Sequence, residues 1–274
     1  MPTVAFQGVE GAFSEEAAQR FWTESVKTVP QVTFSDVFQA VEEGQCAYGI
    51  IPVENSRTGS IHRNIDLLLE HDLSVVGEID LRICHCLLIL PQGSLSSIRT
   101  VYSHPQALEQ CTSYLSRMQN VKLVPYFDTA GSAKHIASQS QSEWACIASE
   151  RAASVYNLKV LADNIADDPD NTTRFLIIST LSNNRPEDGK TSIIFGVPDY
   201  AGALSKCLSI FAERNINLLK IESRPDPKSS WSNWFYLEVS ATMNDNRCSE
   251  AICELGKQTT FLKVLGSYRQ VKAG

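Results

Sequence analysis

The sequence lacks the features that would place the chain in a membrane. No apolar run approaches the roughly 18 residues that a membrane-spanning helix needs. Residues 1–6 have neither a basic start nor an apolar core of the kind found in a secretory signal. We therefore expect a protein that is neither secreted nor inserted in a membrane, and that is located in the cytoplasm.

Metal-binding and redox motifs are also absent. The eight cysteines are scattered, and no Cys-x-x-Cys pair occurs. Cys84, His85 and Cys86 resemble half of a metal site, but no second pair of ligands stands at a suitable spacing. In an alternating strand both sulfur atoms simply face one side. We expect reduced, mostly buried thiols and no metal.

The charge distribution argues against binding to nucleic acid. Residues 1–189 hold 13 Lys and Arg but 23 Asp and Glu, a net charge of −10. Residues 190–274 hold 11 and 8, a net charge of +3. Binding to a phosphate backbone needs a basic stripe, which the first part lacks, and the second part is too mildly positive to suggest one.

The length and composition suggest two domains. With 274 residues, of which 43% are apolar, the chain is long enough for a larger domain and a smaller one. A polar stretch rich in turn formers separates two apolar strands at residues 182–189. We expect residues 1–181 to form the first domain, residues 182–189 a linker and residues 190–274 the second domain.

In the first domain, short apolar runs alternate with amphipathic segments, which predicts an α/β fold with mainly parallel sheets. Such sheets bind ligands at the carboxyl ends of strands, where loops meet helix N-termini. Polar side chains stand at three such ends, in residues 54–56, 103–106 and 128–129, and one long helix is predicted over residues 105–118. These three corners predict one convergent pocket.

The second domain has a different pattern. Strands are predicted over residues 191–197, 217–223, 234–241 and 262–268, and helices over residues 202–214 and 247–258. This order is the βαββαβ, or ferredoxin-like, arrangement. The fold hosts many functions and by itself names none.

Several short motifs stand in a fixed order along the chain. They are GVEGAFSE (8–15), PVENS (52–56), GSI (59–61), YSHPQAL (102–108), QC (110–111), DTAG (128–131), IAS (147–149), NTTRF (171–175) and IESRP (221–225). In this order they resemble the prephenate dehydratase family, which includes arogenate dehydratases, followed by a regulatory ACT domain. The resemblance runs nearly end to end, and NTTRF and IESRP are its most specific parts.

The resemblance implies a two-lobed catalytic domain, similar in plan to periplasmic ligand-binding proteins, with the active site between the lobes. It implies a carbon–oxygen lyase that removes water and carbon dioxide from prephenate to give phenylpyruvate, in phenylalanine biosynthesis. Arogenate dehydration to phenylalanine, or both reactions, is the alternative. No metal or organic cofactor is expected, and the plastid stroma is a further location if a transit peptide has been removed. A non-catalytic sensor of amino acids or dicarboxylates is the alternative from another class.

The family motifs assign the catalytic residues. Thr173 matches the residue expected to touch the departing hydroxyl group, and Asn55, Ser103 and Gln110 match donors of the pocket. A threonine hydroxyl is a feeble acid, so we expect a hydrogen-bond donor or proton relay. Glu54 is expected to orient these groups or to join the proton path, with a solvated loop carboxylate as its alternative.

A doubly negative substrate needs local compensation in an acidic domain. Arg174 is the expected cation, although neighbouring strand residues face opposite sides and Arg174 can instead buttress the strand. His104 is expected to bind substrate, with helix capping as its alternative. The other expected substrate-binding residues are Ser56, Thr129 and Phe175.

For the ACT domain the resemblance implies feedback regulation by phenylalanine, bound at the seam between two copies in a homodimer or homotetramer. A module that only dimerises is the alternative. Ala201 and Leu219 stand where the family commonly has proline and threonine, which bears on the affinity for the ligand. The residues that match the regulatory site are Gly202, Ala203, Leu204, Asn217, Leu218, Glu222, Ser223, Arg224 and Pro225.

Overall fold

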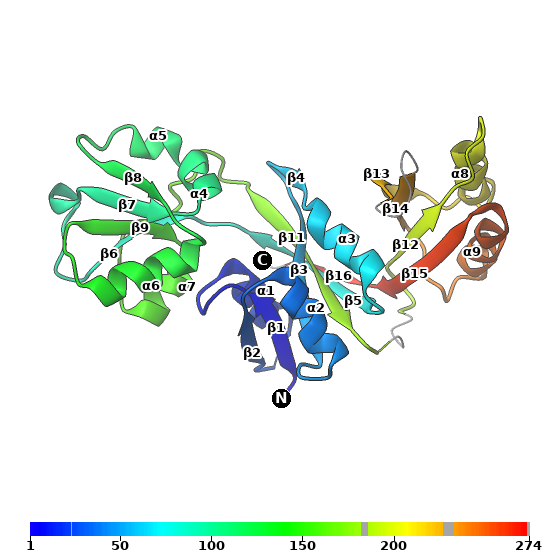
Figure 1. Cartoon of the computed structure of the whole chain (residues 1–274), viewed down its shortest axis with the longest axis horizontal. Helices are drawn as coiled ribbons and strands as arrows, with labels where there is room; N and C mark the ends of the chain where they lie inside the picture. The colour runs from blue at the N-terminus through cyan, green and yellow to red at the C-terminus, as the bar shows by residue number, and fades with distance from the viewer. Residues whose placement is uncertain (23, 182–185, 227–232, 273–274) are drawn as a thin grey trace.

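The computed structural model describes residues 1–22, 24–181, 186–226 and 233–272. Three bodies lie in a row, each built around its own sheet (Figure 1). They are two lobes and a C-terminal domain, and this arrangement confirms the expected α/β fold with two lobes and a ferredoxin-like domain. Within these residues, no helix combines the length and apolar character that crossing a membrane needs.

The first lobe is the middle body in Figure 1. Its sheet has the order β16-β5-β11-β3-β1-β2, with β4 beside β3. The central strands β3 and β11 are almost wholly buried, as expected for strands covered on both faces. The elements of this lobe are β1 (Thr3–Gln7), α1 (Phe13–Phe21), β2 (Lys27–Gln31), α2 (Phe34–Glu42), β3 (Tyr48–Asn55), β4 (Gly59–Ser60), α3 (His62–Glu70), β5 (Ser74–Arg82), β11 (Thr172–Ser179) and β16 (Gln270–Lys272).

The second lobe contains a sheet in the order β10-β6-β9-β7-β8. Its elements are β6 (Cys86–Ile89), the 3₁₀-helix η1 (Leu95–Ser97), β7 (Thr100–Ser103), α4 (Pro105–Gln110), α5 (Thr112–Leu115), β8 (Lys122–Pro125), α6 (Thr129–Gln139), β9 (Trp144–Ala148), α7 (Glu150–Tyr156) and β10 (Lys159–Ala162).

Both lobes have mixed sheets, so the expectation of mainly parallel sheets was wrong. β1 pairs parallel with β2 and β3, but β11 pairs antiparallel with β3 and β5. In the second lobe β7 pairs parallel with β8 and β9, but β6 pairs antiparallel with β9 and β10. The reason is that the chain crosses between the lobes twice, and β11 enters the first sheet on its way back from the second lobe.

Two crossing segments, residues 83–85 and 163–171, join the lobes. They lie side by side and are tied by backbone hydrogen bonds. Ile83 N–H donates to Asn171 O at 2.8 Å, and Ile165 N–H donates to His85 O at 2.9 Å. The side chains of these segments therefore stand at the junction of the two lobes.

The single helix predicted over residues 105–118 is divided into α4 and α5 at Cys111. The carbonyl oxygen of Gln110 accepts a hydrogen bond from Asp167 N–H at 2.7 Å instead of continuing a helical ladder. Because Asp167 belongs to a crossing segment, this bond fixes the end of α4 at the junction of the lobes. The local pattern of apolar residues cannot predict a contact between residues so far apart in the chain.

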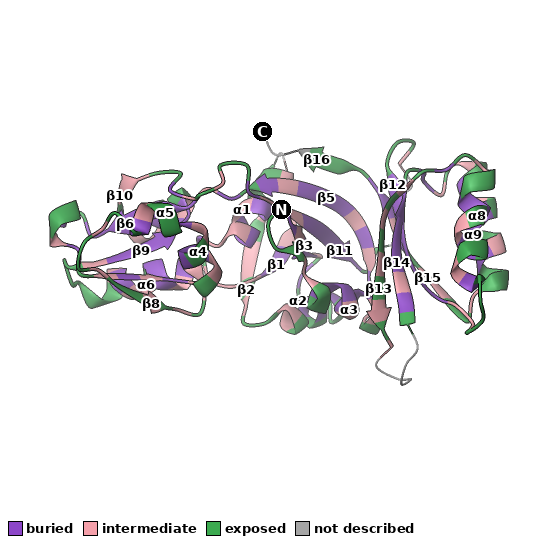
Figure 2. Cartoon of the chain, turned by 90° about the horizontal axis from the view of Figure 1, so that it is seen from above, coloured by how far each residue is buried: buried purple, intermediate pink, exposed green. Residues whose placement is uncertain are grey.

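The C-terminal domain has an antiparallel sheet in the order β13-β14-β12-β15. In β14, Leu237 and Val239 pack on the two helices, whereas Trp234 and Tyr236 belong to a core shared with the first lobe. Figure 2 shows both helices on the side of this sheet that faces away from the lobes. The elements are β12 (Lys190–Gly196), α8 (Ala203–Glu213), β13 (Leu218–Pro225), β14 (Asn233–Val239), α9 (Asn246–Gln258) and β15 (Phe261–Tyr268).

The linker expected at residues 182–189 includes residues 182–185, which lie outside the described residues. On either side of it, β11 ends at Ser179 and β12 begins at Lys190. At the other end of the C-terminal domain, β16 returns to the first lobe and pairs parallel with β5. The C-terminal domain is therefore anchored to the first lobe through a shared core and a shared sheet.

Gly266 permits this anchoring, because β15 and β5 touch there. Its φ is +148°, and a Cβ atom would stand 2.2 Å from the carbonyl oxygen of Val75. We expect Gly266→Ala to lower the free energy of unfolding by about 3 kcal/mol, the sum of backbone strain and overpacking. Gly44 also has a positive φ but meets nothing within 4 Å, so Gly44→Ala should cost only about 1 kcal/mol. Urea unfolding followed by circular dichroism distinguishes the two, and equal losses would contradict the close approach.

Candidate active site

A cavity of about 260 Å³ lies between the two lobes. It combines apolar walls with hydrogen-bonding groups, as small-molecule sites usually do. The first lobe contributes Gln7, Gly8, Ala12, Phe13, Ser14, Phe34, Pro52, Asn55, Thr58, Ile61, Thr173 and Phe175; the second lobe contributes His104, Gln106, Ala107, Gln110, Asp128 and Thr129; the crossing segments contribute Ile83, His85 and Asn171.

Six of the ten residues that the sequence assigned to catalysis or substrate binding line this cavity. Each of the three predicted strand-to-helix corners contributes at least one of them, so the corners do converge. The six are Asn55, His104, Gln110, Thr129, Thr173 and Phe175.

Four of the polar side chains form a continuous chain of hydrogen bonds. The Asn55 Nδ2 group donates to Thr173 Oγ1 at 2.9 Å and to Asn171 Oδ1 at 2.7 Å. Asn171 Nδ2 in turn donates to Gln110 Oε1 at 3.0 Å. Asn55 and Thr173 are paired residues of β3 and β11, so the two strands hold the first bond of this chain in place.

The direction of these hydrogen bonds is fixed by the backbone. Asn55 Oδ1 accepts from the N–H groups of Arg57 at 3.0 Å and Thr58 at 3.3 Å. A backbone N–H can only donate, so the oxygen of Asn55 must face the loop and its NH₂ group must face Thr173. Thr173 Oγ1 is then an acceptor toward Asn55, which leaves its own proton free to be donated into the cavity.

His85 ends this chain, and sequence reasoning missed it as a site residue. Its Nε2 atom lies 3.0 Å from Gln110 Oε1, an acceptor, so the imidazole carries its proton on Nε2. Burial lowers the pKa of His85, which keeps the ring neutral. No local pattern identifies it, because His85 lies in a crossing segment that its contacts with residues 163–171 bring to the cavity.

Helix N-termini and one carboxyl group, that of Asp128, contribute to the electrostatics of the cavity. None of the described residues that line it is Lys or Arg. The first turns of α1 and α6 reach the cavity at Phe13 and Thr129, and helix N-termini attract anions. Asp128 caps α6 by accepting from Gly131 N–H, and burial raises the pKa of its carboxyl group.

His104 has the capping geometry that was its alternative interpretation. Its Nδ1 atom accepts from Gln106 N–H at 3.3 Å at the start of α4. The ring also lines the cavity, so both interpretations apply to the same side chain. Because Nδ1 is used as an acceptor, the neutral ring carries its proton on Nε2.

Arg174 does not supply the cation expected in the pocket. Thr173 and Phe175 line the cavity, so Arg174 between them points to the opposite face of β11. There it binds Glu238 of the C-terminal domain with two hydrogen bonds of 2.8 Å. Glu54 is likewise turned away from the cavity, and pairs with Arg174 at 3.1 Å and Lys220 at 3.0 Å.

Two expected hydroxyl groups are also engaged elsewhere. Ser103 is fully buried and donates to the carbonyl oxygen of Ile147 at 2.7 Å, which ties β7 to β9. Ser56 is exposed and accepts from Thr172 N–H at 3.0 Å. Both hydroxyls stabilise the frame around the cavity and stand outside its walls.

Contacts between the lobes partly close the cleft. Gln106 Nε2 of the second lobe donates to Thr58 Oγ1 of the first at 3.1 Å. Ser149 Oγ donates to Gly11 O at 2.8 Å. Such bridges limit the access of water to a bound substrate.

The expected regulatory residues lie on two sides of the C-terminal sheet. Leu204 and Leu218 line an open hollow beside α8. Glu222 and Arg224 face the first lobe, where Glu222 pairs with His62 at 3.1 Å and Arg224 binds Asp66 with two bonds of 2.9–3.0 Å. A single chain therefore does not bring these four residues together.

The comparisons with known proteins agree with this geometry. The prephenate dehydratase family matches residues 4–183, and the ACT domain matches residues 191–255. The chain belongs to the prephenate dehydratase family. This is a family of lyases, and its match covers both lobes and the cavity between them.

Individual relatives cover nearly the whole chain. A protein of Arabidopsis thaliana named arogenate dehydratase/prephenate dehydratase 2, chloroplastic, is 42% identical over 97% of this chain and 72% of its own length. A crystal structure of prephenate dehydratase from Arthrobacter aurescens in complex with L-Phe is 28% identical to this chain and has a TM-score of 0.88. The match covers 97% of this chain and 89% of that chain. GqqA, described as a novel type of quorum-quenching acylase, has 32% identity and a TM-score of 0.89, with 98% of both chains covered.

The direction of the hydrogen bonds around Asn55 can be tested with an isosteric change. In Asn55→Asp the carboxylate can only accept, so the Thr173 hydroxyl must donate back to it and is lost as a donor to the cavity. We expect kcat to fall about 100-fold, as on removing one transition-state donor, with the fold retained. Steady-state kinetics and thermal unfolding check this. A folded variant with more than a third of the wild-type kcat would show that the hydroxyl is not directed in this way.

Proposed function

We propose that this dehydratase converts prephenate to phenylpyruvate and also accepts arogenate. The observation that carries the proposal is that Asn55 donates to Thr173 Oγ1, which leaves the Thr173 proton free in a cavity between the lobes. The reaction of prephenate needs little more than such a hydrogen-bond donor, since formation of the aromatic ring supplies the driving force. The remaining barrier is the expulsion of a poor leaving group, hydroxide.

The proposed reaction breaks two bonds of the substrate. The bond from the ring to its carboxylate breaks, its electron pair enters the ring, and the C–O bond to the hydroxyl group breaks with its own pair. The Thr173 hydroxyl donates to the departing oxygen and recovers its proton from solvent, so water and carbon dioxide leave while one proton is consumed. Asn55 keeps Thr173 in the donor orientation.

The apolar side chains of the cavity favour the loss of carbon dioxide, the second bond-breaking event of this reaction. Phe13, Phe34, Phe175 and Ile83 offer a surface for a ring that becomes aromatic. A departing carboxylate loses its charge as carbon dioxide forms, and an apolar surface does not stabilise that charge in the ground state. The absence of Lys and Arg from the described wall suits this step.

Asp128 is the observation that supports arogenate as a second substrate. Arogenate carries an ammonium group where prephenate carries a ketone. A carboxyl group in a cavity whose described lining holds no Lys or Arg complements an ammonium. We expect Asp128→Asn, which preserves the helix cap, to lower kcat/KM for arogenate at least fivefold relative to that for prephenate. Assays of both substrates on one preparation check this, and an unchanged ratio would remove Asp128 from substrate discrimination.

For the C-terminal domain we propose feedback inhibition by phenylalanine and pairing of two copies in a homodimer or homotetramer. The support is the ACT match and a relative whose structure contains L-Phe. Leu204 and Leu218 on one copy, with an open β13 edge, offer a seam for a second copy.

We also propose that residues 1–181 act as the catalytic domain, residues 182–189 as the linker and residues 190–274 as the regulatory domain. We propose that the enzyme works in the cytoplasm or in a plastid stroma.

The test of the proposed function compares two adjacent threonines. Purified protein should release phenylpyruvate from prephenate, measured as enolate absorbance in alkali. Thr173→Val should lose about 100-fold or more in kcat, because it removes the donor to the leaving group. Thr172→Val is the matched control, since the Thr172 hydroxyl bonds to Asp170 O outside the cavity. Full turnover by a folded Thr173→Val would refute the assignment.

A further inference from the structure

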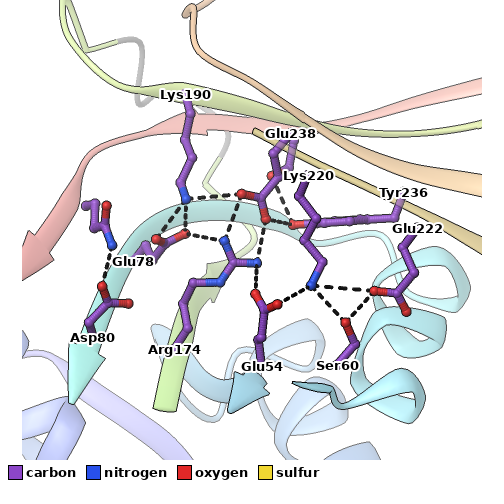
Figure 3. A network of polar contacts seen from close by, with 12 residues as sticks. Glu54, Ser60, Glu78, Asp80, Arg174, Lys190, Lys220, Glu222, Tyr236 and Glu238 are labelled. Atoms are coloured by element: carbon purple, nitrogen blue, oxygen red, sulfur yellow. Dashed lines mark hydrogen bonds and ion pairs between the residues drawn. The ribbon is translucent and has the colours of Figure 1, made fainter. Parts of the chain in front are cut away.

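A buried network of charges joins the back of the active-site strand to the C-terminal domain (Figure 3). Arg174 of β11 is bound by both carboxylate oxygens of Glu238, each at 2.8 Å. Lys190 of β12 bridges Glu238 at 3.1 Å and Glu78 of β5 at 2.7 Å. The mechanism described above uses none of these groups, although Arg174 adjoins Thr173 in sequence.

The pairing of β11 with β3 is irregular beside Arg174. Arg174 is paired with Glu54 of β3, but the next residue, Phe175, is paired with Pro52, so the register shifts by one residue between them. Pro52 has no N–H group to donate to this ladder. The extra residue of this bulge, Val53, lies in β3. A bulge of this kind re-aims the side chains beside it, so we expect the position of Thr173 to be sensitive to what holds its neighbour Arg174.

Glu238 is a rigid anchor for that neighbour. It lies in β14, an interior strand of the C-terminal sheet, and it is paired with Ser192 on one side and Lys220 on the other. Its side chain is completely buried and also accepts from Tyr236 Oη at 2.7 Å. Despite desolvation, the cations Arg174 and Lys190 hold the pKa of Glu238 below its usual range, so it stays a carboxylate.

The other two carboxylates near Arg174 are weaker anchors. Glu54 makes a single contact of 3.1 Å, and its side chain is 37% exposed. Glu78 lies 3.7 Å from Arg174 and is bonded to Lys190 instead. Among these three carboxylates, only Glu238 accepts hydrogen bonds from the guanidinium group with both of its oxygens.

We propose that Glu238 of the C-terminal domain is a positioning residue for the lyase reaction, because its bidentate bond to Arg174 aligns the adjacent Thr173 hydroxyl with the cavity. The regulatory domain thereby supplies part of the active-site frame, and any movement of its sheet relative to β11 is transmitted to Thr173. The proposal rests on the proposed role of Thr173 as donor to the leaving group.

The test removes the charge of Glu238 while its shape is kept. In Glu238→Gln the bidentate bond is lost, and kcat should fall about 10- to 100-fold through misplacement of Thr173, with KM changed less than threefold. Asp66→Asn is the matched control, since it breaks another bidentate ion pair between the first lobe and the C-terminal domain, one that α3 and β13 make without a residue of β11. Its kcat should stay within twofold of wild type.

A double-mutant cycle separates positioning from a general loss of structure. If Glu238 acts through Thr173, adding Glu238→Gln to Thr173→Val should lower kcat by less than threefold further. If the full single-mutant loss is repeated in that background, Glu238 does not act through Thr173 and the proposal is wrong. Glu238→Asp, which keeps the charge, should restore part of the kcat lost in Glu238→Gln.

The outcomes distinguish this inference from the proposed function. If Thr173→Val is inactive but folded Glu238→Gln has wild-type kcat, only the positioning role is refuted. If Thr173→Val is fully active, the proposed function fails first. If neither Glu238→Gln nor Glu238→Asp folds, the network is a folding determinant and the positioning role is rejected.

Discussion

The orientation of one amide group, that of Asn55, governs the chemistry of the cavity. Two backbone N–H groups of the following loop occupy its oxygen, so its nitrogen must face Thr173 and Asn171. This orientation also fixes the donors further along: Asn171 donates to Gln110 Oε1, and the same oxygen accepts from the neutral ring of His85. In the proposed reaction, the weakly acidic Thr173 hydroxyl can serve as a donor because it already accepts from Asn55, which leaves its proton for the substrate.

β11 serves two purposes through the alternation of its side chains. Thr173 and Phe175 face the substrate cavity, and Arg174 faces the C-terminal domain. The strand is antiparallel to both neighbours because it returns from the second lobe. The same crossing that creates the cleft therefore brings the C-terminal domain into contact with the back of the strand that lines the cavity. Under the proposed function, catalysis and regulation would share this strand.

The sequence predicted those parts of the site that depend on local chemistry. The strand-to-helix corners pointed to Asn55, His104 and Thr129. His104 and Thr129 follow the parallel neighbours β7 and β8, whose ends meet at one edge of a sheet, whereas Asn55 joins them from the other lobe. The sequence did not reveal His85 and Asn171, which reach the cavity only because two crossing segments lie side by side. The destination of Arg174 depended on which face of β11 the C-terminal sheet covers. The break at Cys111 depended on Asp167, far along the chain. Each error or omission required a contact between distant segments.

The location of hydrogen atoms tests the central claim most directly. Neutron diffraction from crystals of the deuterium-exchanged protein would show the deuterium atoms of Asn55, Thr173 and His85. The account predicts deuterium from Asn55 Nδ2 directed at Thr173 Oγ1, the Thr173 deuterium directed into the cavity, and deuterium on His85 Nε2 alone. A Thr173 deuterium directed at Asn55, or a doubly protonated His85, would contradict it.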